Sequence, residues 1–283
     1  MEKKEFPWTT PKNIPIYACE WSPIPPAKAV IVLVHGIGEH IGRYEHVAQF
    51  FNQNHIAFIG ADLIGHGKSG GQRGHVDSYD DFMILINWMI AEAENRYSGL
   101  PVILYGHSMG GNLVLYYGLT QDSNVKGIIA TSPGLEVAKV APLTQFLGKL
   151  MYSVFPRFSV NNSLDVTGLS PDQNVVTTYQ NDPLVHPKVS ARLGLDIMKN
   201  GLWIRENAAK ITKPLFIAHG DNDRLASISG TRDFVQRAKG DLTYREFPGG
   251  YHELHNSPEQ TILFDEILKW VDSKILAGAE RPS

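Results

Sequence analysis

The stretch LYGHSMGGNLVLYYG, residues 104–118, constrains the fold of this chain more than any other feature. An apolar run reaches Gly106, a glycine-framed turn carries Ser108, and an apolar helical pattern follows from Gly110 onward. Glycine on both sides of such a turn lets a strand and a helix approach closely, because neither position has a Cβ that would collide. The segment therefore predicts a strained strand–turn–helix connection that holds the Ser108 hydroxyl above the end of a buried strand.

Strand and helix patterns alternate along most of the chain. Strands are expected at 14–21, 29–36, 56–62, 101–106, 125–133, 213–220 and 242–248, and helices at 43–54, 79–96, 109–119, between the last two strands, and over 258–276. Several strand patterns are continuous apolar runs, which are typical of strands covered on both faces of a parallel sheet. The alternation indicates an α/β fold with a mostly parallel central sheet and helices on both faces.

Residues 134–210 interrupt this alternation with two stretches of helical pattern. Ligands of α/β sheets bind beyond the carboxyl ends of the strands, and an insertion after a strand lies at that rim. We therefore predict a core made of residues 1–133 and 211–283, with a helical cap, or lid, inserted at 134–210. The alternative is a helical subdomain that only adds to the core.

Composition limits the partners and the location of the protein. The net charge is −3 and no long basic run occurs, which argues against nucleic acid as a partner. Cys19 is the only cysteine, so no internal disulfide can form. The first residues lack the apolar segment of a signal peptide, and no run approaches the length of a membrane span. We expect a cytoplasmic protein, with peripheral membrane contact left open and the oligomeric state unknown.

The serine at the turn needs a base, because a hydroxyl is a poor nucleophile until its proton is removed. In this type of motif an acid and then a histidine follow the serine along the chain. The segment HGDNDRL offers Asp221 and Asp223, and we favour Asp223 because Asp221 directly follows the turn glycine. The segment GGYHELH offers His252 and His255, and we favour His252 because it closely follows the Gly-Gly turn.

A second glycine-framed turn, VLVHGIGEH, follows an earlier strand. We expect His35 to brace this loop, while its glycines let the backbone approach the substrate. The backbone N–H groups of Ile37 and Met109 would then form an oxyanion hole for a tetrahedral intermediate. No metal-binding cluster, phosphate loop or dinucleotide motif occurs, so no cofactor is expected.

The segments HGIGEHIGRYEHVA, GADLIGHGKSGGQRGHV, GHSMGG, NDPLV, HGDNDRL and GGYHELHN occur in the order found in the monoacylglycerol lipase family. From about residue 8 to 275 the chain resembles that family and its lysophospholipase and esterase relatives. The resemblance implies an α/β-hydrolase fold with a helical cap and hydrolysis of one acyl chain from a small polar headgroup. It also supports Ser108, Asp223 and His252 as the triad. The segment DRLAS has alanine where the mammalian lipase has cysteine, so thiol-directed inhibition should not carry over.

Four polar residues are candidates for binding the headgroup. In the resembling lipases, the positions that match Glu39, Arg43, Tyr179 and His255 line the alcohol-binding end of the site. Glu39 and Arg43 are four residues apart and could pair on one helical turn, which would leave a nearly neutral pocket suited to glycerol. The alternative is that this pair only braces its loop.

An apolar stripe in the predicted cap is a candidate for the acyl-chain site and for membrane contact. Its members recur at helical spacing and include Leu147: Leu143, Leu147, Leu150, Met151, Val154 and Phe155. Acyl chains need apolar walls, so part of this stripe should cover the site. The alternative is that the stripe packs only on the core.

The leading functional prediction is a serine carboxylic ester hydrolase that acts on monoacylglycerol or a similar small lipid ester through an acyl-enzyme intermediate. A lysophospholipase would need basic residues at the cap for its phosphate, and Lys139, Lys149 and Arg157 are the candidates. An aminopeptidase would need acids in the cap for a free amine, where Glu136 and Asp165 occur. A broad-specificity esterase is a further alternative. A non-catalytic ligand-binding protein is disfavoured by the complete set of nucleophile, acid and base.

Overall fold

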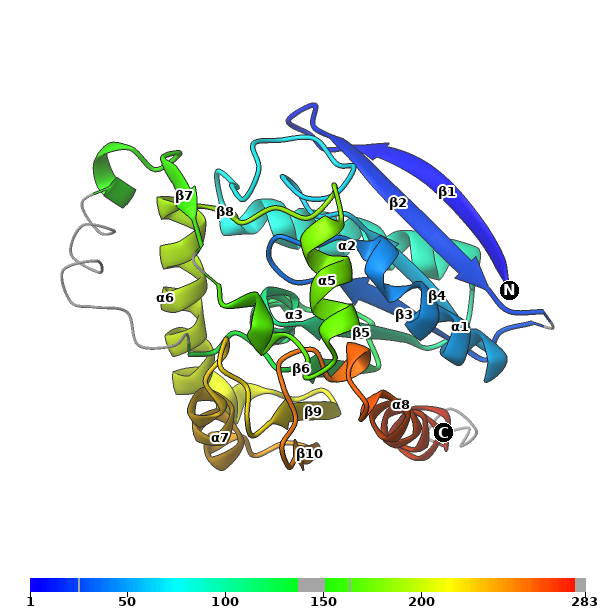
Figure 1. The fold of residues 1–283 in the computed structure, drawn as a ribbon. Coiled ribbons are helices and arrows are strands. Elements are labelled where there is room, and N and C mark those ends of the chain that lie inside the picture. The colour runs from blue at the N-terminus through cyan, green and yellow to red at the C-terminus, as the bar shows by residue number, and fades with distance from the viewer. Residues whose placement is uncertain (25, 137–150, 163, 278–283) are drawn as a thin grey trace.

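The computed structural model of the chain describes residues 1–24, 26–136, 151–162 and 164–277 (Figure 1). Within these ranges the centre is an eight-stranded sheet in the order β1-β2-β4-β3-β5-β6-β9-β10. The strands are β1 Glu2–Thr9, β2 Pro15–Ser22, β3 Ala29–Val34, β4 Ile56–Ala61, β5 Val102–His107, β6 Gly127–Thr131, β9 Leu215–Gly220 and β10 Leu242–Phe247. Strands β3 to β10 of this sheet pair in parallel, while β1 and β2 are antiparallel at one edge. The predicted, mostly parallel sheet is confirmed.

The central strands are covered on both faces. Every residue of β3, β4, β5 and β9 is buried, as their continuous apolar runs predict. Side chains of β3 alternate between two apolar clusters: Val30 and Val32 join one, and Ile31 and Leu33 join the other. The sheet therefore separates two cores, each of which needs helices to close it.

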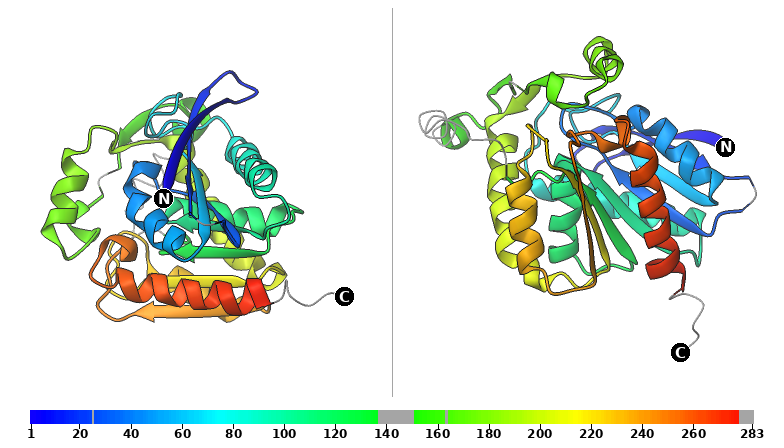
Figure 2. Two further views of the ribbon diagram at one scale, coloured as in Figure 1. Left: turned by 90° about the vertical axis from the view of Figure 1, so that its right-hand side faces the viewer. Right: turned by 60° about the horizontal axis from the view of Figure 1, so that its bottom comes forward.

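Helices close both cores. The main helices are α1 Glu45–Gln53, α2 Tyr79–Arg96, α3 Met109–Thr120, α6 Ala191–Asn207, α7 Ile228–Arg237 and α8 Gln260–Trp270. Apolar side chains of α1 and α8 belong to one cluster, and those of α2, α3, α6 and α7 belong to the other. Figure 2 shows α1 and α8 on one side of the sheet and α6 and α7 on the opposite side. Most of these helices bury one apolar face, as their amphipathic patterns predict, while α3 is buried on all sides from Met109 to Leu115.

Two terminal elements differ from the sequence prediction. Strand β1 was not expected, because EKKEFPWT is largely charged and lacks a buried alternation. It pairs with β2 along its whole length and buries Phe6 and Trp8 against Trp88, with the two indole rings 4.5 Å apart. At the other end, the predicted helix 258–276 consists of α8 followed by a π-helical turn, Val271–Leu276.

The segment between β6 and β9 contributes two different layers. It includes a two-stranded antiparallel sheet of β7 Ser159–Asn161 and β8 Lys188–Ser190, which was not predicted, and the helices α5 Gln173–Asn181 and α6. Helix α6 packs into the core, where Asn112 of α3 donates to the carbonyl of Ile197. Helix α5 lies on the side of the molecule where the loops after the central strands gather (Figure 2). A division between core and cap at residues 134–210 stays a prediction.

None of the helices in the described ranges has both the length and the apolar character needed to cross a membrane.

Candidate active site

Ser108 occupies a strained position between β5 and α3. Its φ of 54° and ψ of −116° are unusual for a residue with a side chain. A Cβ at Gly106 would collide with the carbonyl of Gly110, and one at Gly110 would collide with the carbonyl of Val34. Glycine at both positions therefore allows the sharp turn that the sequence predicts, and the turn presents the Ser108 hydroxyl at the carboxyl end of the sheet.

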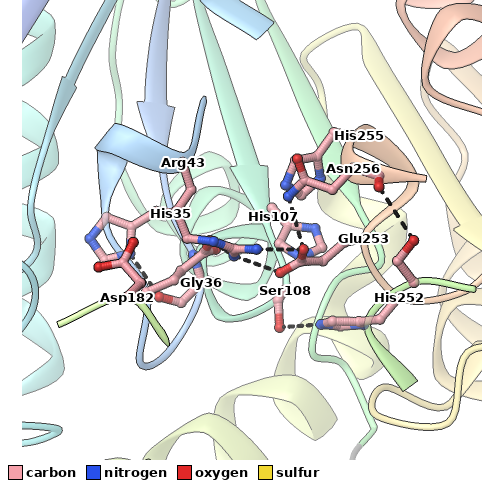
Figure 3. A network of polar contacts seen from close by, with 12 residues as sticks. His35, Gly36, Arg43, His107, Ser108, Asp182, His252, Glu253, His255 and Asn256 are labelled. Carbon is pink, nitrogen blue, oxygen red and sulfur yellow. Dashed lines mark hydrogen bonds and ion pairs between the residues drawn. The ribbon is translucent and has the colours of Figure 1, made fainter. Parts of the chain in front are cut away.

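The structure brings the three predicted catalytic residues together. His252 Nε2 lies 3.0 Å from Ser108 Oγ, and His252 Nδ1 lies 2.7 Å from Asp223 Oδ2. Figure 3 shows the imidazole of His252 extended toward the serine hydroxyl. Asp221, the rejected acid, instead accepts a hydrogen bond from the backbone N–H of Gly249 at 2.6 Å. It therefore binds the turn that precedes His252, a partner that was not predicted.

Asp223 is held as a carboxylate by its surroundings. Its Oδ1 accepts the backbone N–H groups of Leu225 and Ala226 at 2.8 and 3.0 Å, and His219 lies 3.1 Å from Oδ2. Burial would raise the pKa of Asp223, but the charge of His252 and the hydrogen bond from His219 outweigh it and hold the pKa well below its usual range. Burial lowers the pKa of His252, yet the Asp223 carboxylate raises it above its ordinary value.

The backbone at His252 is fixed by residues from other loops. Ser132 Oγ donates to the carbonyl of His252 at 2.8 Å. The backbone N–H of His252 donates to the carbonyl of Gly168 at 3.3 Å, and that of Glu253 to the carbonyl of Leu169 at 2.8 Å. The histidine loop is therefore attached both to the strand end after β6 and to the segment between β6 and β9. Sequence reasoning missed Ser132, whose φ of 42° marks a second strained serine.

The glycine-framed loop after β3 lies directly against the nucleophile. A Cβ at Gly36 would come within 3.2 Å of Ser108 Cβ. This close approach places the next peptide, that of Ile37, beside the serine. Met109 follows Ser108 at the first position of α3, where a backbone N–H has no partner inside the helix. The two predicted oxyanion donors therefore belong to backbones that meet at Ser108.

His35 supports this loop with hydrogen bonds at both ring nitrogens. Its Nε2 accepts the backbone N–H of Leu63 at 2.9 Å, which leaves the Nδ1 hydrogen to bond the carbonyl of Gly36 at 2.7 Å. The ring is fully buried, and desolvation, with the neighbouring His66, lowers the pKa of His35 well below its ordinary value. A neutral His35 with one fixed tautomer thus holds the loop in place.

Glu39 and Arg43 pair with each other, but a third residue joins them. Arg43 Nη1 donates to Glu39 Oε2 at 2.7 Å and to Glu253 Oε1 at 2.6 Å, and Nη2 donates to Glu253 Oε2 at 2.7 Å. Tyr44 donates its hydroxyl to Glu39 at 2.8 Å. The ring of Tyr179 lies 4.7 Å from the Arg43 guanidinium. Sequence reasoning missed Glu253, which adjoins His252.

His255 lies behind the site. Its side chain is completely buried, with the ring stacked on that of Tyr44 at 4.7 Å and edge-on to that of His107 at 4.6 Å. Within the described part of the chain, neither ring nitrogen of His255 has a hydrogen-bond partner. Burial lowers the pKa of His255 to about 3, so the ring is neutral. In this structure it is closed off from solvent.

Much of the predicted apolar stripe, Leu147 included, lies outside the described residues, as do Lys139 and Lys149. In the described part Met151 is half-buried, while Val154 and Phe155 retain 55% and 61% of their accessible surface. They border a hollow of about 650 Å³ together with Met151, Pro156, Arg157, Phe158, Arg192 and Asp77. Among the described residues, no group of three or more ligating side chains is arranged to hold a metal ion.

A family model described as Hydrolase_4, serine aminopeptidase S33, matches residues 25–259. The chain belongs to this family. This Hydrolase_4 member is 35% identical to a monoacylglycerol lipase from Mycolicibacterium smegmatis, over 90% of this chain and 92% of that one. It is 30% identical to the monoglyceride lipase of Homo sapiens over 100% of both chains.

A solved structure gives the same result. The Hydrolase_4 chain superposes on the monoacylglycerol lipase of Paleococcus ferrophilus with a TM-score of 0.84 and 33% identity, covering 92% of this chain and 99% of that one. The α/β-hydrolase fold, the serine-hydrolase class and the resemblance to monoacylglycerol lipases are thereby confirmed.

Proposed function

We propose that this protein hydrolyses monoacylglycerol, releasing a fatty acid and glycerol through an acyl-enzyme. The observation that carries the proposal is the continuous contact from Asp223 through His252 to Ser108, at the strained turn after β5. Relatives that match nearly the whole chain are monoacylglycerol lipases, which supports this substrate over other esters.

The geometry supports a two-step reaction. Ser108 Oγ attacks the ester carbonyl while His252 Nε2, 3.0 Å away, takes the hydroxyl proton. His252 then gives that proton to the glycerol oxygen as the C–O bond breaks, leaving the acyl group on Ser108. A water molecule, activated by the same imidazole, attacks the acyl-enzyme and releases the fatty acid. Asp223 keeps the His252 tautomer with its proton on Nδ1 throughout.

The oxyanion of each tetrahedral intermediate would bind the backbone N–H groups of Ile37 and Met109. The support is the approach of Gly36 to Ser108 and the position of Met109 at the start of α3. Such donors stabilise charge that develops only in the transition state, and losing one costs about 10²–10³-fold in kcat.

Of the four headgroup candidates, Tyr179 is best placed to contact glycerol. A Cβ at Gly38 would lie 3.6 Å from the Tyr179 hydroxyl, so this hydroxyl faces the loop that carries Ile37. Glu39 and Arg43 are engaged with each other, and His255 is buried behind them. A tyrosine hydroxyl can both donate to and accept from a diol, which suits an uncharged alcohol.

We further propose that the acyl chain binds beneath the cap predicted at residues 134–210, of which residues 137–150, Leu147 included, lie outside the described part of the chain. The exposed Val154, Phe155 and Phe158 would contact the surface of a lipid aggregate, where the substrate resides. Burial of each acyl methylene contributes about 0.8 kcal/mol, so a tunnel of this kind favours long chains.

The alternative functions are less well supported by the described residues. Arg157, a phosphate candidate, lies 2.8 Å from Asp77 in an ion pair. Glu136 and Asp165, the amine candidates, pair with Arg205 and Arg224 at 3.1 Å each. These pairs occupy the charges of the candidates that the structure describes, while Lys139 and Lys149 lie outside the described residues.

A hydrolysis panel tests the proposal. The purified protein is assayed on monoacylglycerols, lysophospholipids, fatty-acid ethyl esters and aminoacyl amides, with Ser108→Ala as control. We expect the highest kcat/KM on monoacylglycerol and a loss of about 10⁴-fold or more in Ser108→Ala. A fluorophosphonate should label wild type at Ser108. Equal rates on the glyceride and the ethyl ester would leave a general esterase, and labelling of another serine would refute the triad.

A further inference from the structure

Arg43 bridges two buried carboxylates that belong to different loops. It donates one hydrogen bond to Glu39 and two to Glu253, at 2.6–2.7 Å, while Glu39 and Glu253 are each 2% exposed. Figure 3 shows the guanidinium reaching Glu253 beside Ser108 and His252. We name this set, Glu39, Arg43 and Glu253, the carboxylate clamp.

Each carboxylate of the clamp is attached to one half of the proposed catalytic machinery. Glu39 Oε1 accepts the backbone N–H of Gly36 at 2.6 Å, so it fixes the loop that presents the Ile37 peptide. Glu253 directly follows His252 in the chain. Arg43 therefore joins the oxyanion loop to the histidine loop, which are about 210 residues apart in sequence.

The guanidinium is occupied by these contacts. Both Nη atoms bond carboxylates, and the ring of Tyr179 lies 4.7 Å from the Arg43 guanidinium carbon. Burial would raise the pKa of Glu253, but the charge and hydrogen bonds of Arg43 hold it well below its usual range. The Arg43–Glu253 contact is thus a buried ion pair with bidentate geometry, the most directional form of such a pair.

A buried ion pair is a poor way to gain stability, because desolvation of the two charges offsets most of their attraction. Apolar side chains of similar volume would pack the same space. What the bidentate pair provides is a fixed distance and angle between the two loops. Catalysis depends on that relation, since a misplacement of about 1 Å can cost 10²-fold in rate.

We infer that Arg43 and Glu253 are positioning residues, which set the imidazole of His252 against the oxyanion donors and do not bind the headgroup. This inference rests on the proposed function. It predicts a loss in kcat on every ester, whereas a headgroup role predicts a higher KM for the glyceride alone.

The test compares Arg43→Met, Arg43→Lys and Glu253→Gln on a short soluble nitrophenyl ester and on monoacylglycerol. Active sites are titrated to completion with a fluorophosphonate, so kcat refers to competent protein only. For Arg43→Met we expect a kcat lower by about tenfold to a hundredfold on both substrates, with KM within about twofold. Arg43→Lys and Glu253→Gln, which keep a charge or the side-chain shape, should lose less.

The matched control is Arg96→Met. Arg96 also forms a partly buried ion pair, 2.8 Å from Glu20, but it ends α2 and precedes the amino end of β5. The Arg96→Met substitution should lower the melting temperature and leave kcat per titrated site unchanged.

Three results would overturn the inference: an unchanged kcat per site in Arg43→Met, an effect on glyceride KM alone, or an equal kcat loss in Arg96→Met. If Arg43→Met does not fold, the inference is tested with Arg43→Lys and Glu253→Gln. A kcat equal to that of wild type in both variants would refute a positioning role for Arg43 and Glu253. Failure of the proposed function is distinct, because it shows in wild type: either the fluorophosphonate labels another serine, or monoacylglycerol is hydrolysed no faster than the ethyl ester.

Discussion

Ser132 Oγ donates a hydrogen bond to the main-chain carbonyl of His252, over 2.8 Å and across 120 residues of sequence. Ser132 is fully buried at the end of β6, and its φ of 42° is costly for a side-chain-bearing residue. A strained backbone at this position indicates that the hydroxyl is needed where it lies.

Ser132→Ala should therefore destabilise the protein and slow it. The carbonyl of His252 would lose a buried partner, at a cost of about 1–3 kcal/mol in the free energy of unfolding. Looser placement of His252 should lower kcat by up to about tenfold. Urea denaturation and kcat per titrated site measure the two effects. Ser132→Gly, which removes the same hydrogen bond but relieves the positive φ, should be the more stable variant; the reverse order would contradict the account of strain.

Activity should fall in acid with a midpoint above that of a free histidine. His252 must be neutral to accept the Ser108 proton, and the Asp223 carboxylate raises the pKa of His252 above about 6.5 despite burial. As the pH falls through this raised pKa the imidazole gains a proton and kcat/KM for an uncharged soluble ester declines. Circular dichroism over the same pH range controls for unfolding. A profile that stays flat down to pH 5 would exclude a histidine base.

Tyr179→Phe should reduce selectivity for the glycerol headgroup. Removing the hydroxyl that faces Gly38 should raise KM for monoacylglycerol by about 5–10-fold, which is the effect of losing one neutral hydrogen bond to the substrate. The ethyl ester of the same fatty acid should be hydrolysed as before. Tyr97→Phe is the matched control, since its hydroxyl bonds Glu20 on β2, which lies away from Ser108 next to the edge strand β1. An equal effect of Tyr179→Phe on both esters would refute a headgroup contact.

Gly110→Ala should destabilise the fold, although alanine is the better helix former. Its Cβ would collide with the carbonyl of Val34, which is backbone and cannot move aside cheaply. We expect a loss of about 1–3 kcal/mol in the free energy of unfolding. Gly194→Ala in α6 is the control, because its Cβ would only touch Val189 at 3.5 Å. Helix propensity should make that variant about 0.5–1 kcal/mol more stable. Equal stability of the two variants would contradict the collision at Gly110.

Local pattern was enough to predict the central sheet and to choose the residues that meet at Ser108. The strands β3, β4 and β5 are short apolar runs, and the glycines around Ser108 admit few other turns. Asp223 and His252 each follow a strand whose end must lie at the same edge of a parallel sheet. These features depend on the type and spacing of residues along the chain, so they can be predicted from the sequence alone.

Long-range polar partners could not be predicted in this way. Glu253 reads as an ordinary loop residue, and nothing near it in sequence indicates that Arg43 will neutralise it. Likewise Ser132 gives no sign that it will bond the carbonyl of His252. His255 was expected beside the substrate because the matching position lines the alcohol-binding end of the site in the resembling lipases, yet the turn Leu254–Asn256 directs its ring into the interior.

The unexpected strand β1 also bears on how the molecule behaves in crowded solution. Its first four residues, 2–5, are charged and exposed, and Pro7 removes one backbone donor from the strand. Pairing of a neighbouring molecule with this edge of the sheet would desolvate these charges, which is unfavourable. Without β1, the hydrogen-bonding edge of β2 would be open, beside the wholly buried Cys19 and Trp21. We therefore expect that deletion of β1 increases aggregation when the protein is concentrated, as measured by light scattering.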